Sequence, residues 1–404
     1  MDRLSVVDEI FLRTHRGLGT PIALQGLWRT AEPMDPAVLR AIHDRLRVGP
    51  LGRRVREPRV PGARRAWQRN TRAHPLSLAP GPVGDPLAWA ATLGADLDPG
   101  RGPGWRLAAA PLADGGTLAA LTCSHALADA RGLIHAVDLA LRDGPAGGDA
   151  PGGLGGGSDW ADAAGQWATV LTGTARALRA GVPRPHRVPA PEVPGGRTTS
   201  AAVFAIAADA WDATATATGG TANSLFIHLV ANMLWETGFP LGEIRASLPV
   251  DTRDEPRVDN DMAMTEIAVT RADTPATIRR AAREAYRRKM SGPDGLPEEI
   301  LQVIPDRWAY ALSRGAGERD ILCSNIGELP ASLDRVGPHR CTSVAARAIH
   351  PGLERFPRTR LSGYLSRIGD HYTLALAGLA ADRVTLHTAA ERAFAAAGLP
   401  ARPW

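Results

Sequence analysis

Short continuous apolar runs alternate along the chain with longer stretches in which apolar residues recur every three or four positions. The short runs predict strands, expected at 22–29, 118–123, 199–207, 244–250, 262–269, 361–368 and 372–379. The longer stretches predict helices, expected at 4–12, 35–47, 159–179, 223–236, 274–290, 297–312 and 382–397. In the helix at 159–179, the residues spaced for burial are Trp160, Ala164, Trp167, Val170 and Leu171. The alternation predicts an α/β (α+β) fold.

One connection between a predicted strand and a predicted helix carries titratable residues. The run 118–123 shows no polar alternation, which indicates a strand covered on both faces, and it ends at Ser124 and His125. A helix pattern begins at Asp129, a residue type favoured at helix N-caps. His125 is therefore expected where a rigid scaffold can hold a titratable group in a cavity.

The residue types alone leave the role of His125 and Asp129 open. His125 can be a hydrogen-bonded loop histidine beside a capping aspartate. It can instead be a general base, because an imidazole with a pKa of about 6.5 accepts a proton from a hydroxyl or an amine at neutral pH. A metal site is not expected, since no Cys or His at ligand spacing accompanies the pair.

In its context this stretch resembles the acyltransferase superfamily of chloramphenicol acetyltransferase, peptide-synthetase condensation domains and bacterial wax ester synthase/diacylglycerol acyltransferase enzymes. The mark of that family is His-His-x-x-x-Asp-Gly after a strand. Here His125 and Asp129 match, whereas Ser124 stands for the first His and Ala130 for the Gly. Glycine permits backbone angles that alanine resists, and we expect Gly132 to relax the turn.

Three further segments resemble the family in the same order along the chain. Residues 4–12 read Leu-Ser-x-x-Asp-x-x-Phe-Leu, similar to the first motif of the wax ester synthase group and of mycobacterial lipid acyltransferases. Residues 249–253 match Pro-Val-x-x-Arg, and Asn260 matches a downstream Asn, with Asp259 where the family has Gly. Residues 324–327 resemble the Ser-Asn element that the superfamily places near its cavity.

The resemblance implies a pseudo-dimer of two chloramphenicol-acetyltransferase-like lobes with a tunnel between them. We expect the first lobe at 1–181, a proline-rich connector at 182–197 and the second lobe at 198–404. By the same resemblance His125 is the general base in the tunnel, while Asp129 supports its loop together with Gly132 and an arginine, for which Arg253 is the candidate. The tunnel would be lined by Ser124, Asn260, Ser324 and Asn325.

The function implied by the resemblance is acyl transfer from a thioester to a hydroxyl or amine of a small molecule, in lipid or secondary-metabolite biosynthesis. The donor would be acyl-CoA or a phosphopantetheine-bound acyl group on a carrier protein, used as substrate, and no bound cofactor is expected. One alternative is peptide-bond condensation, although condensation domains more often have Gln where Asp8 stands. The other is a noncatalytic relative that binds a partner protein through the same fold.

Eight arginines gather between Gly52 and Arg72, in a chain with a formal net charge of +5. Such a run is usually a solvated surface. The alternative is a landing site for the phosphates of coenzyme A or for an acidic carrier protein. Nucleic-acid binding would require interleaved aromatic residues, and Trp67 is the only aromatic residue in the run. No nucleic-acid partner is therefore expected.

The composition, with 404 residues, 44% hydrophobic and 22% charged, is that of a globular protein long enough for two domains. No apolar run reaches the length of a membrane-spanning helix, and the first residues resemble neither a signal peptide nor an anchor, so no transmembrane segment is expected. The 3 cysteines lack Cys-x-x-Cys spacing, so we expect no disulfide framework. The cytoplasm is the expected location.

Overall fold

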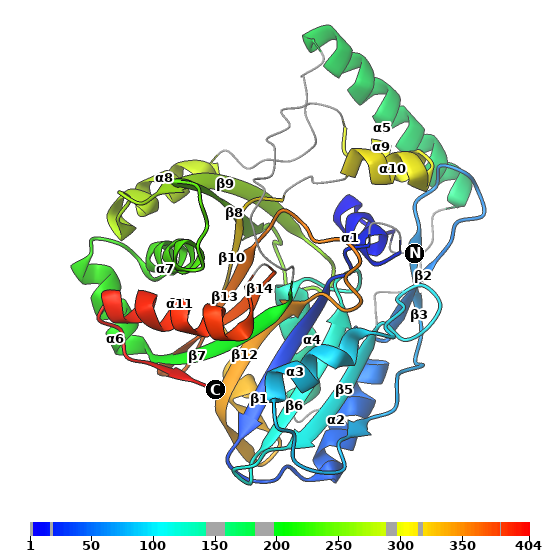
Figure 1. The fold of residues 1–404 in the computed structure, drawn as a ribbon. Helices are drawn as coiled ribbons and strands as arrows, with labels where there is room; N and C mark the ends of the chain where they lie inside the picture. Colours follow the sequence, from blue (N-terminus) through cyan, green and yellow to red (C-terminus); the bar gives the residue numbers. More distant parts are fainter. Residues whose placement is uncertain are drawn as a thin grey trace.

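The computed structural model describes residues 3–16, 19–142, 158–181, 198–287, 297–313, 318–379 and 381–404 (Figure 1). They form two lobes, each built on one large sheet with helices packed against it. The proline-rich connector predicted at 182–197 lies outside the described residues. Within them, no helix is long and apolar enough to span a bilayer.

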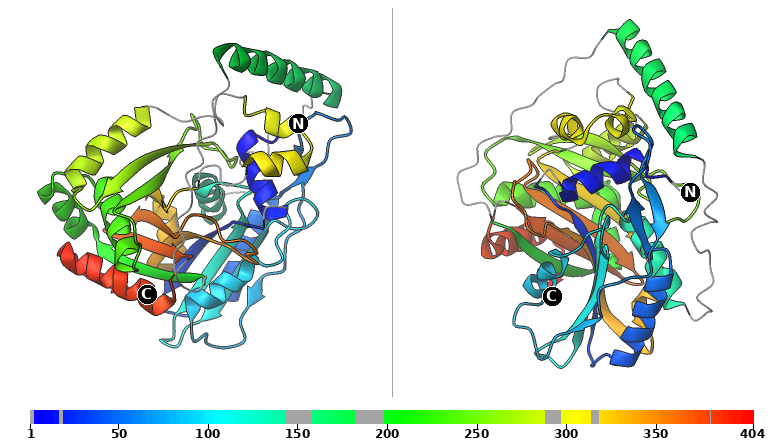
Figure 2. Two further views of the ribbon diagram at one scale, coloured as in Figure 1. Left: turned by 45° about the horizontal axis from the view of Figure 1, so that its top comes forward. Right: turned by 90° about the vertical axis from the view of Figure 1, so that its right-hand side faces the viewer.

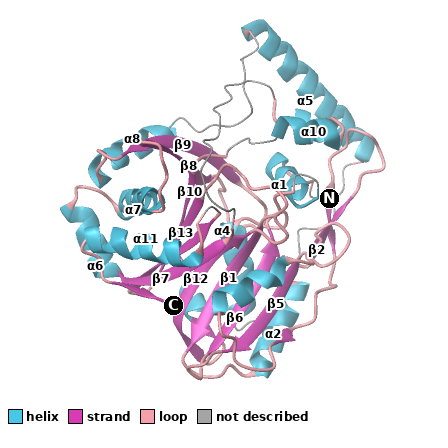
Figure 3. Cartoon of the chain, in the orientation of Figure 1, coloured by secondary structure: helices cyan, strands magenta, loops and turns pink. Residues whose placement is uncertain are grey.

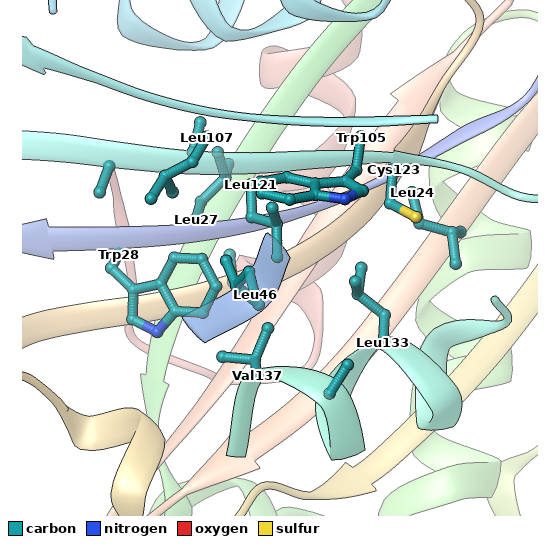
Figure 4. Close-up of a cluster of buried hydrophobic side chains, with 14 of the residues drawn as sticks. Leu24, Leu27, Trp28, Leu46, Trp105, Leu107, Leu121, Cys123, Leu133 and Val137 are labelled. Atoms are coloured by element: carbon teal, nitrogen blue, oxygen red, sulfur yellow. The ribbon is translucent and has the colours of Figure 1, made fainter. Parts of the chain in front are cut away.

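The first sheet has the strand order β11-β12-β1-β6-β5-β4. These strands are β1 (Ala23–Thr30), β4 (Ser77–Leu78), β5 (Trp105–Pro111), β6 (Thr117–Ser124), β11 (Arg335–Val336) and β12 (His339–Ile349). Helices α2 (Pro36–Val48) and α4 (Ala130–Leu141) cover one face, and side chains from strands and helices interlock there in a buried core (Figure 4). All of β6 is buried, which confirms the prediction of a strand covered on both faces.

The second sheet has the strand order β15-β7-β14-β13-β10-β8-β9. These strands are β7 (Ser200–Ala207), β8 (Glu243–Asp251), β9 (Met262–Thr270), β10 (Ile321–Glu328), β13 (Leu361–Ile368), β14 (His371–Gly378) and β15 (Ala401–Pro403). Helices α6 (Ala208–Ala217), α7 (Ala222–Glu236), α8 (Pro275–Arg287) and α11 (Arg383–Ala396) lie on its outer side (Figures 1 and 3). Phe226 and Met233 of α7 are completely buried, in agreement with the apolar face predicted for that helix.

Strand β12 joins the two lobes. It follows β10 of the second sheet along the chain, yet it pairs antiparallel with β1 of the first sheet, with Ile349 opposite Ala23. The predicted division assigned 198–404 to the second lobe, whereas the pairing places β11 and β12 in the first sheet. Local hydrophobic pattern could not indicate this, because it does not specify which distant strand becomes the partner.

Helix α5 (Asp159–Ala180) begins where predicted and ends one residue later, but it does not have the predicted burial. Trp160 is 75% exposed and Leu171 is 63% exposed, so the expectation that they are buried is wrong. Of the five positions predicted to be buried only Val170 is, and the other buried residues described on the helix are Ala163, Gln166 and Ala177. Figure 2 shows α5 at the periphery, apart from both sheets. A narrow stripe along one side of the helix is enough for this edge contact.

The arginine-rich run forms a hairpin of β2 (Arg53–Arg56) and β3 (Ala66–Arg69), and the loop between these strands lies beside α5. Arg64 pairs with Asp162 of α5 at 2.7 Å, and Arg65 pairs with Glu9 of α1 (Val6–Arg16) at 2.7 Å. The interpretation of the whole run as a solvated face is therefore wrong. These arginines join α1, the hairpin and α5 through partly buried ion pairs.

Candidate active site

His125 is the second residue of a tight turn, formed by residues 124–127, at the end of β6. Its backbone N–H donates to the Ile22 carbonyl at 3.1 Å, which continues the β1–β6 pairing by one residue. The turn is closed by the Leu127 N–H, which donates to the Ser124 carbonyl at 2.9 Å. Phe11 of α1 stacks on the imidazole with 3.5 Å between ring centroids and 10° between ring planes. The ring is therefore fixed between the end of the first sheet and α1.

Asn260, just before β9 in the second half of the chain, decides which imidazole nitrogen carries the proton. Its Nδ2 donates to the Asp8 Oδ1 at 2.8 Å and to the His125 carbonyl at 2.9 Å, so its other amide atom is the oxygen. This Oδ1 lies 3.1 Å from the His125 Nδ1. Because an amide oxygen only accepts, Nδ1 must be the donor, and Nε2 keeps the basic lone pair.

The surroundings of His125 also favour the neutral ring. Burial lowers its pKa, while its own backbone carbonyl, the Asp129 carboxylate and Asn260 act in the opposite direction. The ordinary pKa is 6.5, so a lowered value leaves the imidazole unprotonated at pH 7. A neutral imidazole with Nδ1 committed to hydrogen bonding can accept a proton at Nε2.

Asp129 is committed to the structure of the loop rather than to the imidazole. Its Oδ1 accepts the Gly132 N–H at 2.8 Å and so caps α4. Its Oδ2 accepts Nη2 of Arg253 at 2.6 Å and the Asp261 N–H at 3.0 Å. Arg253 also donates to the Asp259 carbonyl at 2.8 Å. The predicted arginine is thus in contact with Asp129, and the pair ties the start of α4 to the loop that carries Asn260.

Gly132 lies where the loop that carries Val258 and Asn260 crosses the first turn of α4. A Cβ on Gly132 would come within 2.3 Å of the Val258 carbonyl oxygen. Only glycine fits this approach without a backbone shift. Ala130 lies at the first position of α4 and is tolerated there.

The residues predicted to line the tunnel differ in their burial and in their hydrogen-bond partners. Ser124 is 1% exposed, and its hydroxyl accepts the Ala126 N–H at 3.4 Å. Asn325 of β10 donates to Asn223 at 3.1 Å and accepts the Gly327 N–H at 3.0 Å, both within the second lobe. Ser324 precedes it on β10 and is partly buried. Among the residues predicted to line the tunnel, Asn260 is the one that contacts His125, and the lining role of the others stays a prediction.

Two residues beside the site were not predicted as members of it. Asp8 is 1% exposed and accepts both the backbone and the side-chain N–H of Asn260, at 3.2 and 2.8 Å. Arg53 donates to the Leu127 carbonyl and to Asp259, each at 2.5 Å, and lies over the Trp67 ring at 4.0 Å. In the sequence, Asp8 stood out only within the family-like motif at 4–12, and Arg53 only as one of many arginines.

A second histidine lies beside His125 across β1. Ala23 of β1 is opposite Ser124 of β6 and Ile349 of β12. One residue further along, Ile22 is therefore opposite His125 on one side and His350 on the other. The spacing of strands in a sheet separates the two Cα atoms by roughly 10 Å. His350 donates from Nδ1 to the Pro21 carbonyl at 3.2 Å, and burial lowers its pKa to about 4, with the His125 charge acting in the same direction. His350 was not predicted, because β12 was assigned to the other lobe.

Comparison with known proteins gives a likeness in structure. No family model and no curated protein matches the sequence. The wax ester synthase/diacylglycerol acyltransferase from Marinobacter aquaeolei VT8 superposes with a TM-score of 0.59 at 15% identity, over 98% of this chain and 100% of that one. The first condensation domain of the CDA synthetase gives a TM-score of 0.58 at 17% identity, over 97% and 93%. This chain has the condensation-domain fold.

The same fold occurs inside a larger protein. The chain covers 42% of the nonribosomal peptide synthetase FmoA3, with 98% of its own length aligned, a TM-score of 0.58 and 16% identity. These likenesses confirm the predicted fold, and the two large sheets correspond to the two predicted lobes. At such identities they concern the fold, and the chemistry has to be argued from the site itself.

Proposed function

We propose that this protein is an acyltransferase that moves an acyl group from a thioester donor to a hydroxyl or an amine of a small-molecule acceptor. The observation that carries the proposal is the hydrogen bond between Nδ1 of His125 and Oδ1 of Asn260, which leaves Nε2 as a base. The fold supports it, because solved structures of this fold include a wax ester synthase/diacylglycerol acyltransferase and a condensation domain.

In this reaction Nε2 of His125 takes the proton from the acceptor as its oxygen or nitrogen attacks the thioester carbonyl. The carbon–oxygen double bond opens to a tetrahedral oxyanion, which then re-forms the carbonyl and expels the thiolate. The imidazolium returns its proton to the sulfur, so the products are an ester or amide and a free thiol. No acyl group is attached to the protein at any stage.

The residues around His125 keep this geometry in place. The ion pair of Asp129 with Arg253 and the close approach at Gly132 hold the turn against the loop that carries Asn260. A base held in a fixed position increases the reaction rate, because no entropy has to be lost to orient it when the acceptor binds. Asp129 takes no part in proton transfer in this scheme.

The donor would be acyl-CoA or an acyl group on the phosphopantetheine of a carrier protein, in either case a substrate rather than a bound cofactor. A tunnel lined by Ser124, Asn260, Ser324 and Asn325 would bring donor and acceptor to His125 from opposite sides. The proposal places the reaction in lipid or secondary-metabolite biosynthesis.

The direct test is mass spectrometry of products after incubation with a panel of acyl-CoAs and acyl-pantetheine thioesters, each offered with alcohols and amines. We expect an ester or amide that forms with the wild type and not with His125→Ala. His228→Ala is the matched control, because His228 lies on α7, where Nε2 contacts Asn232 at 3.1 Å, and it should leave turnover unchanged. Product formation that His125→Ala leaves intact would contradict the proposal.

The same panel, extended by carrier proteins loaded with aminoacyl groups as acceptors, separates the competing functions. Peptide-bond condensation would require an aminoacyl group on a carrier as the acceptor, so a product formed only with that acceptor would favour it. A noncatalytic partner-binding protein would give no product with any pair. Transfer of a simple acyl group to a free alcohol or amine would favour the proposed acyltransferase over both.

A further inference from the structure

Asp8 is a buried carboxylate whose position is not explained by packing alone. It lies in the first turn of α1 and is 1% exposed. Its Oδ2 accepts the Ser5 N–H at 2.9 Å, and its own N–H donates to the Ser5 hydroxyl at 3.0 Å, an arrangement that caps the helix. Capping needs no burial, yet Oδ1 is turned inward to Asn260. A buried charge is unfavourable unless something compensates it.

The two carboxylates near His125 differ in how their charge is compensated. Asp129 is held by Arg253 at 2.6 Å. For Asp8, no arginine lies within ion-pair distance in the described parts of the chain, and Arg53, whose charge acts on it, is hydrogen-bonded to Asp259 instead. The Asp8 charge therefore remains available to polarise the amide to which it is bonded, that of Asn260.

Asn260 connects this charge to the imidazole. Its Nδ2 faces the carboxylate of Asp8 at 2.8 Å, and its Oδ1 faces Nδ1 of His125 at 3.1 Å. When the imidazole takes a proton at Nε2, the positive charge spreads to Nδ1–H, next to the polarised amide oxygen. Hydrogen bonds in such a chain strengthen one another, most of all in a buried setting.

We propose that Asp8 is a positioning residue of the active site, which acts through Asn260 to fix the Nδ1–H tautomer of His125 and to stabilise the imidazolium formed during acyl transfer. The inference rests on the proposed function for its catalytic meaning. Its structural content, a carboxylate–amide–imidazole chain that assembles α1, the loop before β9 and the turn after β6, can be measured separately.

Four further charged or titratable groups act on the hydrogen-bonded chain of Asp8, Asn260 and His125. Arg53 and Asp259 act on Asp8, Asp129 acts on His125, and His350 and His125 influence each other. Burial raises the pKa of Asp8 to about 6, against the opposing effects of Arg53 and Asn260. The carboxylate is therefore mostly ionised at pH 7.

The test measures the pKa of His125 by NMR of histidine-labelled protein, with the signal assigned by its loss in His125→Ala. In Asp8→Asn the negative charge is gone, so we expect the His125 pKa to fall by about half a unit or more. The acid limb of kcat/KM should move to lower pH by the same amount. We expect kcat to fall about tenfold to hundredfold with little change in KM, the size of effect seen when the hydrogen-bond partner of a metal-ligating histidine is removed.

Two further variants make the result specific. Glu9→Gln changes the adjacent carboxylate of α1, which pairs with Arg65 and Arg13, and it should affect stability while the His125 pKa stays unchanged. In an Asn260→Ala background, Asp8→Asn should have no further effect on the His125 pKa, because the connecting amide is missing.

An Asp8→Asn protein that is folded and keeps the wild-type His125 pKa would overturn the inference, as would equal effects of Asp8→Asn with and without Asn260. The NMR titration needs no substrate, so its outcome is independent of the acyltransferase assignment. If the pKa shift occurs and no thioester is turned over, the positioning chain stands and the proposed function fails.

Discussion

Arg253 and Asp129 form an ion pair across the two halves of the chain, with 2.6 Å between Nη2 and Oδ2 and side chains that are 8% and 6% exposed. One residue belongs to the segment after β8 and the other begins α4. The pair therefore couples the turn that carries His125 to the loop that carries Asn260.

Replacement Asp129→Asn should destabilise the protein on the order of 3 kcal/mol, because the buried charge of Arg253 loses this partner. Asparagine can still accept the Gly132 N–H, so the helix cap is retained. The loss of stability then measures the effect of removing the Asp129 charge. Chemical denaturation of Asp129→Asn, of Arg253→Met and of the double variant gives the measurement. We expect the double variant to be more stable than Asp129→Asn. Additive losses would show that the pair is not coupled.

A methyl group at Gly132 should destabilise the protein by about 1–3 kcal/mol, the range for overpacking a tight contact, because it would collide with the Val258 carbonyl. The matched control is Gly165→Ala within α5, where an added Cβ meets nothing within 4 Å. That variant should gain up to about 1 kcal/mol from helix propensity. Thermal unfolding of both proteins distinguishes the two positions. Equal stability of Gly132→Ala and the wild type would mean that the loop can move away from α4.

The buried carboxylate of Asp8 should make stability depend on pH. Burial raises its pKa from 3.8 to about 6, so the folded state binds the proton more tightly than the unfolded chain. This contribution is complete below pH 3.8 and is lost as pH rises towards 6. Between pH 4 and pH 7 the unfolding free energy of Asp8→Asn should therefore gain on the order of 3 kcal/mol relative to the wild type. Denaturant titrations at several pH values test this, and a constant difference would refute the raised pKa.

Much of the local structure could be predicted from the spacing of apolar residues along the sequence. The predicted strand 262–269 is β9 (Met262–Thr270), and the predicted helix 35–47 is α2 (Pro36–Val48), with Asp35 as its N-cap. These segments combine a clear apolar period with a strong boundary residue, so tertiary contacts did not override the local preference. The fold of the two lobes was also predicted, through the order of several short motifs.

The residues that the sequence did not indicate depend on contacts between distant segments. His350 comes beside His125 only because β12 pairs with β1, more than 300 positions away along the chain. The inward orientation of Asp8 depends on Asn260, which lies 252 positions later. Neither relationship leaves a periodic signal. For the same reason α5 was correctly predicted as a helix, while the face that it buries was not.

Whether Nε2 of His125 is the proton acceptor can be decided from the steady-state turnover of His125→Ala with an identified acyl donor and acceptor. We expect kcat to fall about a hundredfold to ten-thousandfold, the usual contribution of a general base. The unfolding midpoint should stay close to that of the wild type, and His228→Ala, measured in parallel, should retain full turnover. A folded His125→Ala protein with wild-type turnover would show that His125 is not the general base.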